Sequence, residues 1–71
     1  MKIQLLDVVV LKNAIPEEKL QQGAIGTVVE VLGDALYLVE FADKNGVAYA
    51  IVDLPEQLLM KVVQEPMASE V

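Results

Sequence analysis

The sequence contains no cysteine, histidine, tryptophan or arginine, and Thr27 and Ser69 are its hydroxyl-bearing residues besides two tyrosines. Nucleophilic catalysis by serine or cysteine needs a neighbouring base such as imidazole, and zinc sites use cysteine or histidine ligands. The absence of cysteine also excludes disulfides and thiol redox chemistry, which suits a reducing compartment. These absences predict a protein that is not an enzyme and that holds no cofactor.

Positive charge is scarce, because five lysines stand against eleven acidic residues and give a net charge of -6. Binding to nucleic acids or anionic membranes depends on lysine and arginine side chains that meet phosphate groups. The composition therefore predicts neither a nucleic-acid nor a membrane partner. It leaves a basic protein as an electrostatically favourable partner, the alternative being that the acids only keep a small apolar protein soluble.

Long apolar runs are also missing. No stretch approaches the roughly 20 residues that span a bilayer, and residues 1–12 lack a small-residue cleavage site, so they resemble a strand more than a signal peptide. At 71 residues the chain has room for one domain near the lower size limit of independent stability. We expect a soluble cytoplasmic protein.

Runs of β-branched and aliphatic residues alternate with turn signals along the chain, at the spacing typical of an all-β protein. The expected strands are residues 5–12, 23–32, 35–42, 47–54 and 59–63, and short helical turns are expected at Pro16 and Pro55. Structural turns are expected at Gly23, Gly26, Gly33 and the Asn45-Gly46 pair, which is a strong hairpin signal.

This organisation predicts an all-β fold, a small five-stranded SH3-like barrel with one or two short helical turns. The barrel domain is expected over residues 1–63. Residues 64–71 have no apolar period and are expected to form a flexible tail.

Conventional ligand sites are poorly matched by the motifs. The segment at residues 43–46 resembles the start of a calcium loop, but the twelfth position, which needs a bidentate glutamate, is Leu54. Gly23 and Gly26 are too closely spaced for a phosphate loop, and no lysine with a following hydroxyl accompanies them. The sequence therefore predicts no metal site.

Strand alternation predicts that more apolar side chains face outward than a small surface usually carries. Glu30, Glu40 and Asp53 mark the outward positions and are expected to form an acidic rim. The candidate interface within that rim is Val9, Leu11, Val28, Leu32, Leu36, Leu38, Tyr49 and Ile51. Three interpretations stay open: coverage by the protein's own bulges and loops, self-association as a homodimer, or docking of a different protein.

The order of motifs along the chain carries a resemblance. It comprises DVVVL at residues 7–11, IPE at 15–17, GTVVE at 26–30, VEF at 39–41 and AIV at 50–52. Over about residues 3–62 this order resembles a family of short bacterial proteins, frequent in cyanobacteria, named domain of unknown function 4926. The resemblance implies a small SH3-like protein without a recognised catalytic set, and an antitoxin-like or accessory role.

Taken with the composition, these features favour a non-catalytic binding module that acts through protein-protein interaction and that self-associates or binds a basic protein. The alternative is a small-molecule or ion-binding barrel, in which Tyr37, Tyr49 and acidic side chains line a shallow mouth.

Overall fold

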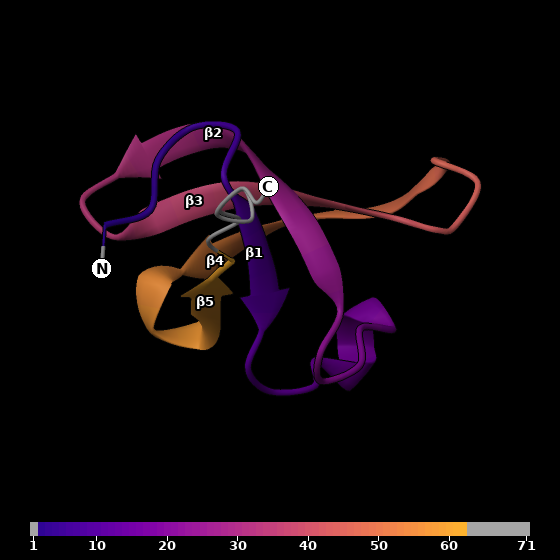
Figure 1. Ribbon diagram of the computed structural model, residues 1–71. Coiled ribbons are helices and arrows are strands. Elements are labelled where there is room, and N and C mark those ends of the chain that lie inside the picture. The colour runs from indigo at the N-terminus through magenta and orange to yellow at the C-terminus, as the bar shows by residue number, and fades with distance from the viewer. Residues whose placement is uncertain (1, 63–71) are drawn as a thin grey trace, which may run out of the picture.

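The computed structural model describes residues 2–62. Five strands form one antiparallel sheet in the order β4-β3-β2-β1-β5 (Figure 1). The elements are β1 (Val8–Leu11), η1 (Pro16–Glu18), β2 (Ile25–Gly33), β3 (Leu36–Ala42), β4 (Ala48–Pro55), η2 (Glu56–Leu58) and β5 (Leu59–Lys61). The prediction of an all-β fold with five strands and two short helical turns is confirmed.

The sheet differs from the prediction in one respect, because it is not closed into a barrel. Within residues 2–62, β4 and β5 form the two edges of the sheet and do not pair with each other. The predicted tail at residues 64–71, and Val63 at the end of the last predicted strand, lie outside the described residues.

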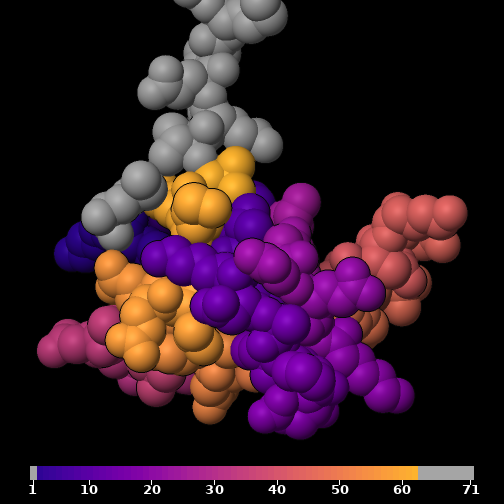
Figure 2. Space-filling model, turned by 90° about the horizontal axis from the view of Figure 1, so that it is seen from below, coloured from indigo at the N-terminus to yellow at the C-terminus, as the bar shows by residue number. Residues whose placement is uncertain are grey.

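The core lies against one face of the sheet, the inner face. It includes residues of every strand together with Ile3 and Leu20, which show that the first residues and the segment after β1 fold over that face. Figure 2 shows this first third of the chain against the segment of β4, η2 and β5. The buried apolar residues are Ile3, Val9, Leu11, Leu20, Val28, Tyr37, Val39, Phe41, Leu54 and Leu59.

The prediction that Val9 and Leu11 face outward is wrong, because both are almost completely buried. That prediction assumed that Asp7 is part of the strand and faces solvent, so that every second residue after it also faces outward. Asp7 instead precedes β1, in a turn where its Oδ2 accepts the backbone N–H of Gln4 at 2.7 Å. A charged residue outside the strand does not fix which of its side chains face the core.

Val28 is also predicted to face outward and is also buried, because β2 contains a β-bulge. Val28 lies opposite Val39, but Glu30 lies opposite Leu38, so Val29 is an extra residue in the pairing. A bulge breaks the strict alternation of faces along a strand. Alternation counted back from Glu30 therefore assigns Val28 to the wrong face.

The turns agree with the sequence in part. Gly23 and Gly46 adopt positive φ, at 89° and 81°, which glycine permits without a Cβ penalty. Gly33 is not the turn residue of the next hairpin, since it ends β2 and the left-handed conformation falls on Ala35 at a φ of 62°. The two turn residues are Asp34 and Ala35, so the turn predicted at Gly33 is displaced by one position along the chain.

Asp43 organises the hairpin between β3 and β4. Its Oδ1 accepts the backbone N–H groups of Asn45 at 2.8 Å and Val47 at 3.0 Å, and its carbonyl accepts the N–H of Gly46. This hairpin projects from the body of the molecule (Figure 1). Its two strands are therefore exposed to solvent near the turn.

Candidate functional site

Side chains at paired positions of neighbouring strands share a face, so the register of the sheet shows which residues meet opposite the core. Leu38 of β3 lies between Glu30 of β2 and Asp53 of β4. In the next outward row of the sheet, Glu40 lies between Thr27 and Ile51. We call this surface the outer face of β2–β4; its members are Thr27, Glu30, Leu36, Leu38, Glu40, Ile51 and Asp53.

The structure brings together three of the predicted interface residues. Leu36, Leu38 and Ile51 all belong to the outer face of β2–β4, and Ile51 is 57% exposed. Leu32 is exposed but lies at the second register shift of β2, beside the turn. Leu32 therefore borders the outer face without a cross-strand partner in it.

Tyr49 is separated from those three residues. It is the extra residue at the register shift of β4, because Phe41 lies opposite Ala50 and Ala42 lies opposite Ala48. Its ring lines a hollow formed with Lys19 and residues 21–24. Tyr49 is exposed, as predicted, but it is next to the segment that follows η1.

The predicted acidic rim is instead interleaved with the apolar residues. Glu30 and Asp53 flank Leu38 on its two neighbouring strands, and Glu40 is the cross-strand neighbour of Ile51. No lysine occurs in β2, β3 or β4. The outer face of β2–β4 thus combines aliphatic surface with carboxylates that have no lysine on the same three strands.

A second apolar strip crosses β2, β1 and β5 on the same outer side of the sheet, next to the outer face of β2–β4, and was missed by the sequence reasoning. Val10 of β1 lies opposite Ile25 of β2 and Met60 of β5, and both partners are more than half exposed. Strand alternation could have predicted this strip, because Val10 faces the outer side once Val9 and Leu11 are placed in the core. The strip carries no acidic side chain at these paired positions.

The alternative site that joins Tyr37 to Tyr49 is not formed. Tyr37 is buried on the inner face and lines an open hollow of about 660 Å³ with Val31, Asp34 and Glu56, whereas Tyr49 lines a different hollow. Burial raises the pKa of Tyr37, and the Glu56 carboxylate raises it further. The prediction of one shared mouth lined by the two tyrosines is therefore wrong.

Within residues 2–62, no three or more aspartate or glutamate side chains gather in a cluster able to hold a metal ion. The arrangement of the carboxylates on the outer face follows the strand pairing, with an apolar residue between Glu30 and Asp53.

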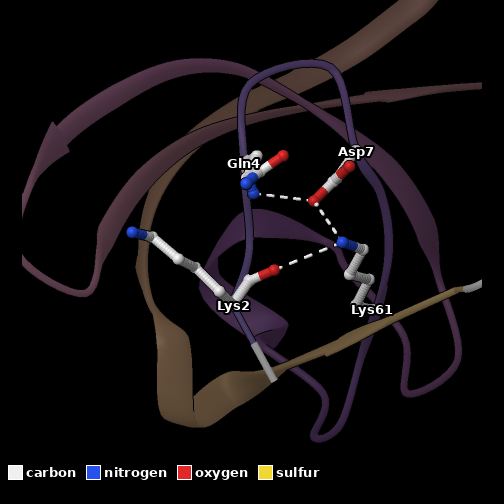
Figure 3. Close-up of polar contacts among 4 residues, drawn as sticks. All are labelled: Lys2, Gln4, Asp7 and Lys61. Atoms are coloured by element: carbon white, nitrogen blue, oxygen red, sulfur yellow. Dashed lines mark hydrogen bonds and ion pairs between the residues drawn. The ribbon is translucent and has the colours of Figure 1, made fainter.

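The clearest polar network holds the first residues against β5 (Figure 3). Lys61 Nζ lies 3.2 Å from Asp7 Oδ2 and donates to the carbonyl oxygen of Lys2 at 3.3 Å. The Gln4 N–H bond lowers the pKa of Asp7, burial partly opposes this, and the Lys61 ammonium lowers the pKa further. These contacts fasten residues 2–7 to β5.

Neither short helix in the described part of the chain is long and apolar enough to cross a membrane. The family model described as Domain of unknown function (DUF4926) matches residues 5–61, which include all five strands. Searches of curated proteins and of solved structures found no match.

Proposed function

The chain belongs to the DUF4926 family, and from that premise we propose that it is a non-catalytic accessory module that binds another protein through the outer face of β2–β4. The family description names no activity, so the proposal rests on the chemistry of this face. The resemblance inferred from the order of motifs is confirmed by the family match over residues 5–61.

The observation that carries the proposal is an apolar surface on the adjacent strands β3 and β4 that residues 2–62 leave uncovered. Leu36 and Ile51 remain exposed, and Leu38 between them is half-buried, although residues 2–62 contain two loop segments that fold over the opposite face. Exposed apolar side chains gathered on neighbouring strands are typical of interfaces, and their burial is favourable by about 25 cal/mol per Å². A partner that covers them removes this surface from water.

The charge of the face supports a basic partner over a second copy of the chain. Glu30, Glu40 and Asp53 are fixed on the same surface as the leucines, and each copy carries a net charge of -6. Complementary charge accelerates encounter and disfavours like-charged partners. The absence of cysteine fits a reducing compartment, so we place this interaction in the cytoplasm.

Affinity capture from the native cell, followed by mass measurement of the intact complex, tests the proposal. Ile51→Glu and Leu38→Glu should each lose the captured protein, because a carboxylate replaces an apolar contact. Met60→Glu is the matched control, since Met60 is similarly exposed but lies on the strip formed with Val10. All variants must first give the circular dichroism spectrum of the parent protein.

Capture of the same protein by Ile51→Glu and by the parent protein would contradict the proposal. So would a parent protein that captures nothing and stays monomeric at every concentration.

A further inference from the structure

The two edges of the sheet are protected to different degrees. β5 has three residues, and its Lys61 is held by Asp7 and the Lys2 carbonyl. β4 has eight residues, no lysine and a proline only at its last position. Short length, lysine and internal proline are common means of preventing unwanted pairing at an edge. β4 has none of them.

The backbone groups that β4 offers follow from the ladder. The N–H of Glu56 donates to the carbonyl of Ala35 at 2.9 Å, and hydrogen-bonded pairs alternate with non-hydrogen-bonded pairs along an antiparallel ladder. In the register of β3 and β4, this makes Leu54 and Val52 hydrogen-bonded partners of β3. Ile51 and Asp53 therefore direct their N–H and C=O groups toward the free side of β4, which no other strand of residues 2–62 pairs with.

The side chains of these two residues also belong to the outer face of β2–β4. Ile51 lies beside Glu40, and Asp53 lies beside Leu38. A strand added at the free side would place one residue opposite Ile51 and one opposite Asp53, both on this same face. Backbone pairing and side-chain recognition would thus occur at the same two positions.

We propose that β4 accepts an extended segment of a partner protein as a sixth strand, with an apolar residue opposite Ile51 and a lysine or arginine opposite Asp53. This inference rests on the proposed function and specifies how the partner binds. Main-chain hydrogen bonds give such strand addition its affinity, and alternate side chains give it specificity.

Charge complementarity selects this occupant. The three acids of the outer face have no lysine on β2, β3 or β4 to neutralise them, and Asp53 is the one that lies on the edge strand, so a segment with a basic residue opposite Asp53 meets a complementary charge. A second copy of β4 would bring further carboxylate and no basic residue. Figures 1 and 2 show that the turn end of the hairpin of β3 and β4 stands away from the rest of the chain.

The probe for the test is a synthetic eight-residue peptide of the repeat Val-Thr-Lys-Thr, whose every second side chain faces one side of an extended strand, so that a lysine lies opposite Asp53 when a valine lies opposite Ile51. Its control has glutamate in place of lysine. Amide hydrogen exchange of the full-length protein is followed by NMR. The lysine peptide should slow exchange at Ile51 and Asp53 at least ten-fold at saturation. The amide of Lys61, which lies on the other edge, should not change.

A backbone variant separates strand addition from contact with side chains alone. Ile51→Pro removes the free N–H without removing a ladder bond to β3, and Ile51→Ala removes the side chain but keeps that N–H. Ile51→Pro should raise the dissociation constant for the lysine peptide at least ten-fold relative to Ile51→Ala. Unchanged exchange at Ala50 and Val52 in the free variants shows that β4 still pairs with β3.

Four results would overturn the inference. Binding with unchanged exchange at Ile51 and Asp53 places the peptide on the face alone. If the glutamate peptide binds with the same affinity as the lysine peptide, charge does not select the partner. If the lysine peptide does not bind at millimolar concentration, β4 does not accept an added strand. Protection that grows with protein concentration without peptide assigns the edge to a second copy. The capture experiment with Ile51→Glu and Met60→Glu decides the proposed function separately.

Discussion

The side chain of Val39 lies directly over the backbone of Gly26, so that a Cβ placed on Gly26 would be 2.6 Å from Cγ1 of Val39. The same Cβ would lie 3.0 Å from the carbonyl oxygen of Glu40, which cannot move without disturbing the ladder of β3. Gly26 therefore lets β3 and its core side chains approach β2 closely. Its role is a close approach within a strand and not the turn predicted from the sequence.

Gly26→Ala should destabilise the protein by about 1–3 kcal/mol, the usual cost of overpacking a core. Gly33→Ala is the matched control, because a Cβ at Gly33 has no atom within 4 Å and its φ is not positive. Urea unfolding monitored by circular dichroism measures both. Equal stability of the two variants would show that the contact with Val39 is relieved at no cost.

Ala35 presents the opposite situation, since an alanine occupies the left-handed region in the turn between β2 and β3. Ala35→Gly should raise the free energy of unfolding by about 0.5–1 kcal/mol, because the Cβ penalty exceeds the entropy lost by glycine. Gly23→Ala, at a φ of 89°, should lower it by about 1 kcal/mol. Thermal unfolding should therefore give a higher melting temperature for Ala35→Gly and a lower one for Gly23→Ala than for the parent protein.

Turn chemistry and strand composition were sufficient to predict five strands and two short helical turns, because the signals at Pro16, Gly46 and Pro55 are local. The assignment of faces could not be completed in the same way. A bulge at Val29 changes the phase of β2 within the strand, and this shift depends on pairing with β3. Likewise Asp7 gives the wrong phase to β1, because its partners are Gln4 and the distant Lys61.

The candidate site was predicted in part for the same reason. β3 and the second half of β4 alternate regularly, so Leu36, Leu38 and Ile51 were placed on the correct side together with Glu40 and Asp53. The unpaired side of β4 could not be found from sequence. Which strand is an edge depends on the order of strands in the sheet, and alternation along one strand contains no information on it.

The corrected placement of Leu11 leads to a test by core truncation. Leu11→Ala should destabilise the protein by about 2–5 kcal/mol, since it opens a cavity around a fully buried side chain. Ile25→Ala, on an adjoining strand at 61% exposure, should change stability by less than about 0.5 kcal/mol. Urea unfolding distinguishes the two residues. A loss of stability at Leu11→Ala as small as that of Ile25→Ala would show that the Leu11 side chain is not buried.

The network around Asp7 predicts an acid-dependent loss of stability. The pKa of Asp7 is lower in the folded protein, chiefly through the Gln4 N–H bond and then through Lys61. Its stabilising contribution is therefore complete above the ordinary value of about 3.9 and is lost as pH falls through the folded value. NMR titration of the Asp7 carboxyl carbon measures this pKa directly.

Lys61→Met should raise the pKa of Asp7 only part of the way to its ordinary value, because the N–H of Gln4 still donates to the carboxylate. Gln4→Ala is the control, since it keeps that backbone donor and should leave the pKa unchanged. A titration in which Lys61→Met returns Asp7 fully to about 3.9 would show that the ion pair dominates.

The pairing of β1 with β5 brings the first strand against the last, with Val9 opposite Lys61. By contrast, β2, β3 and β4 are neighbours in both sequence and space. Closing a long loop costs more entropy than forming a hairpin, so the three-stranded meander can form early while the junction of β1 and β5 must come late. Folding should therefore complete the outer face of β2–β4, with its open edge, before the core is sealed at the opposite end of the sheet.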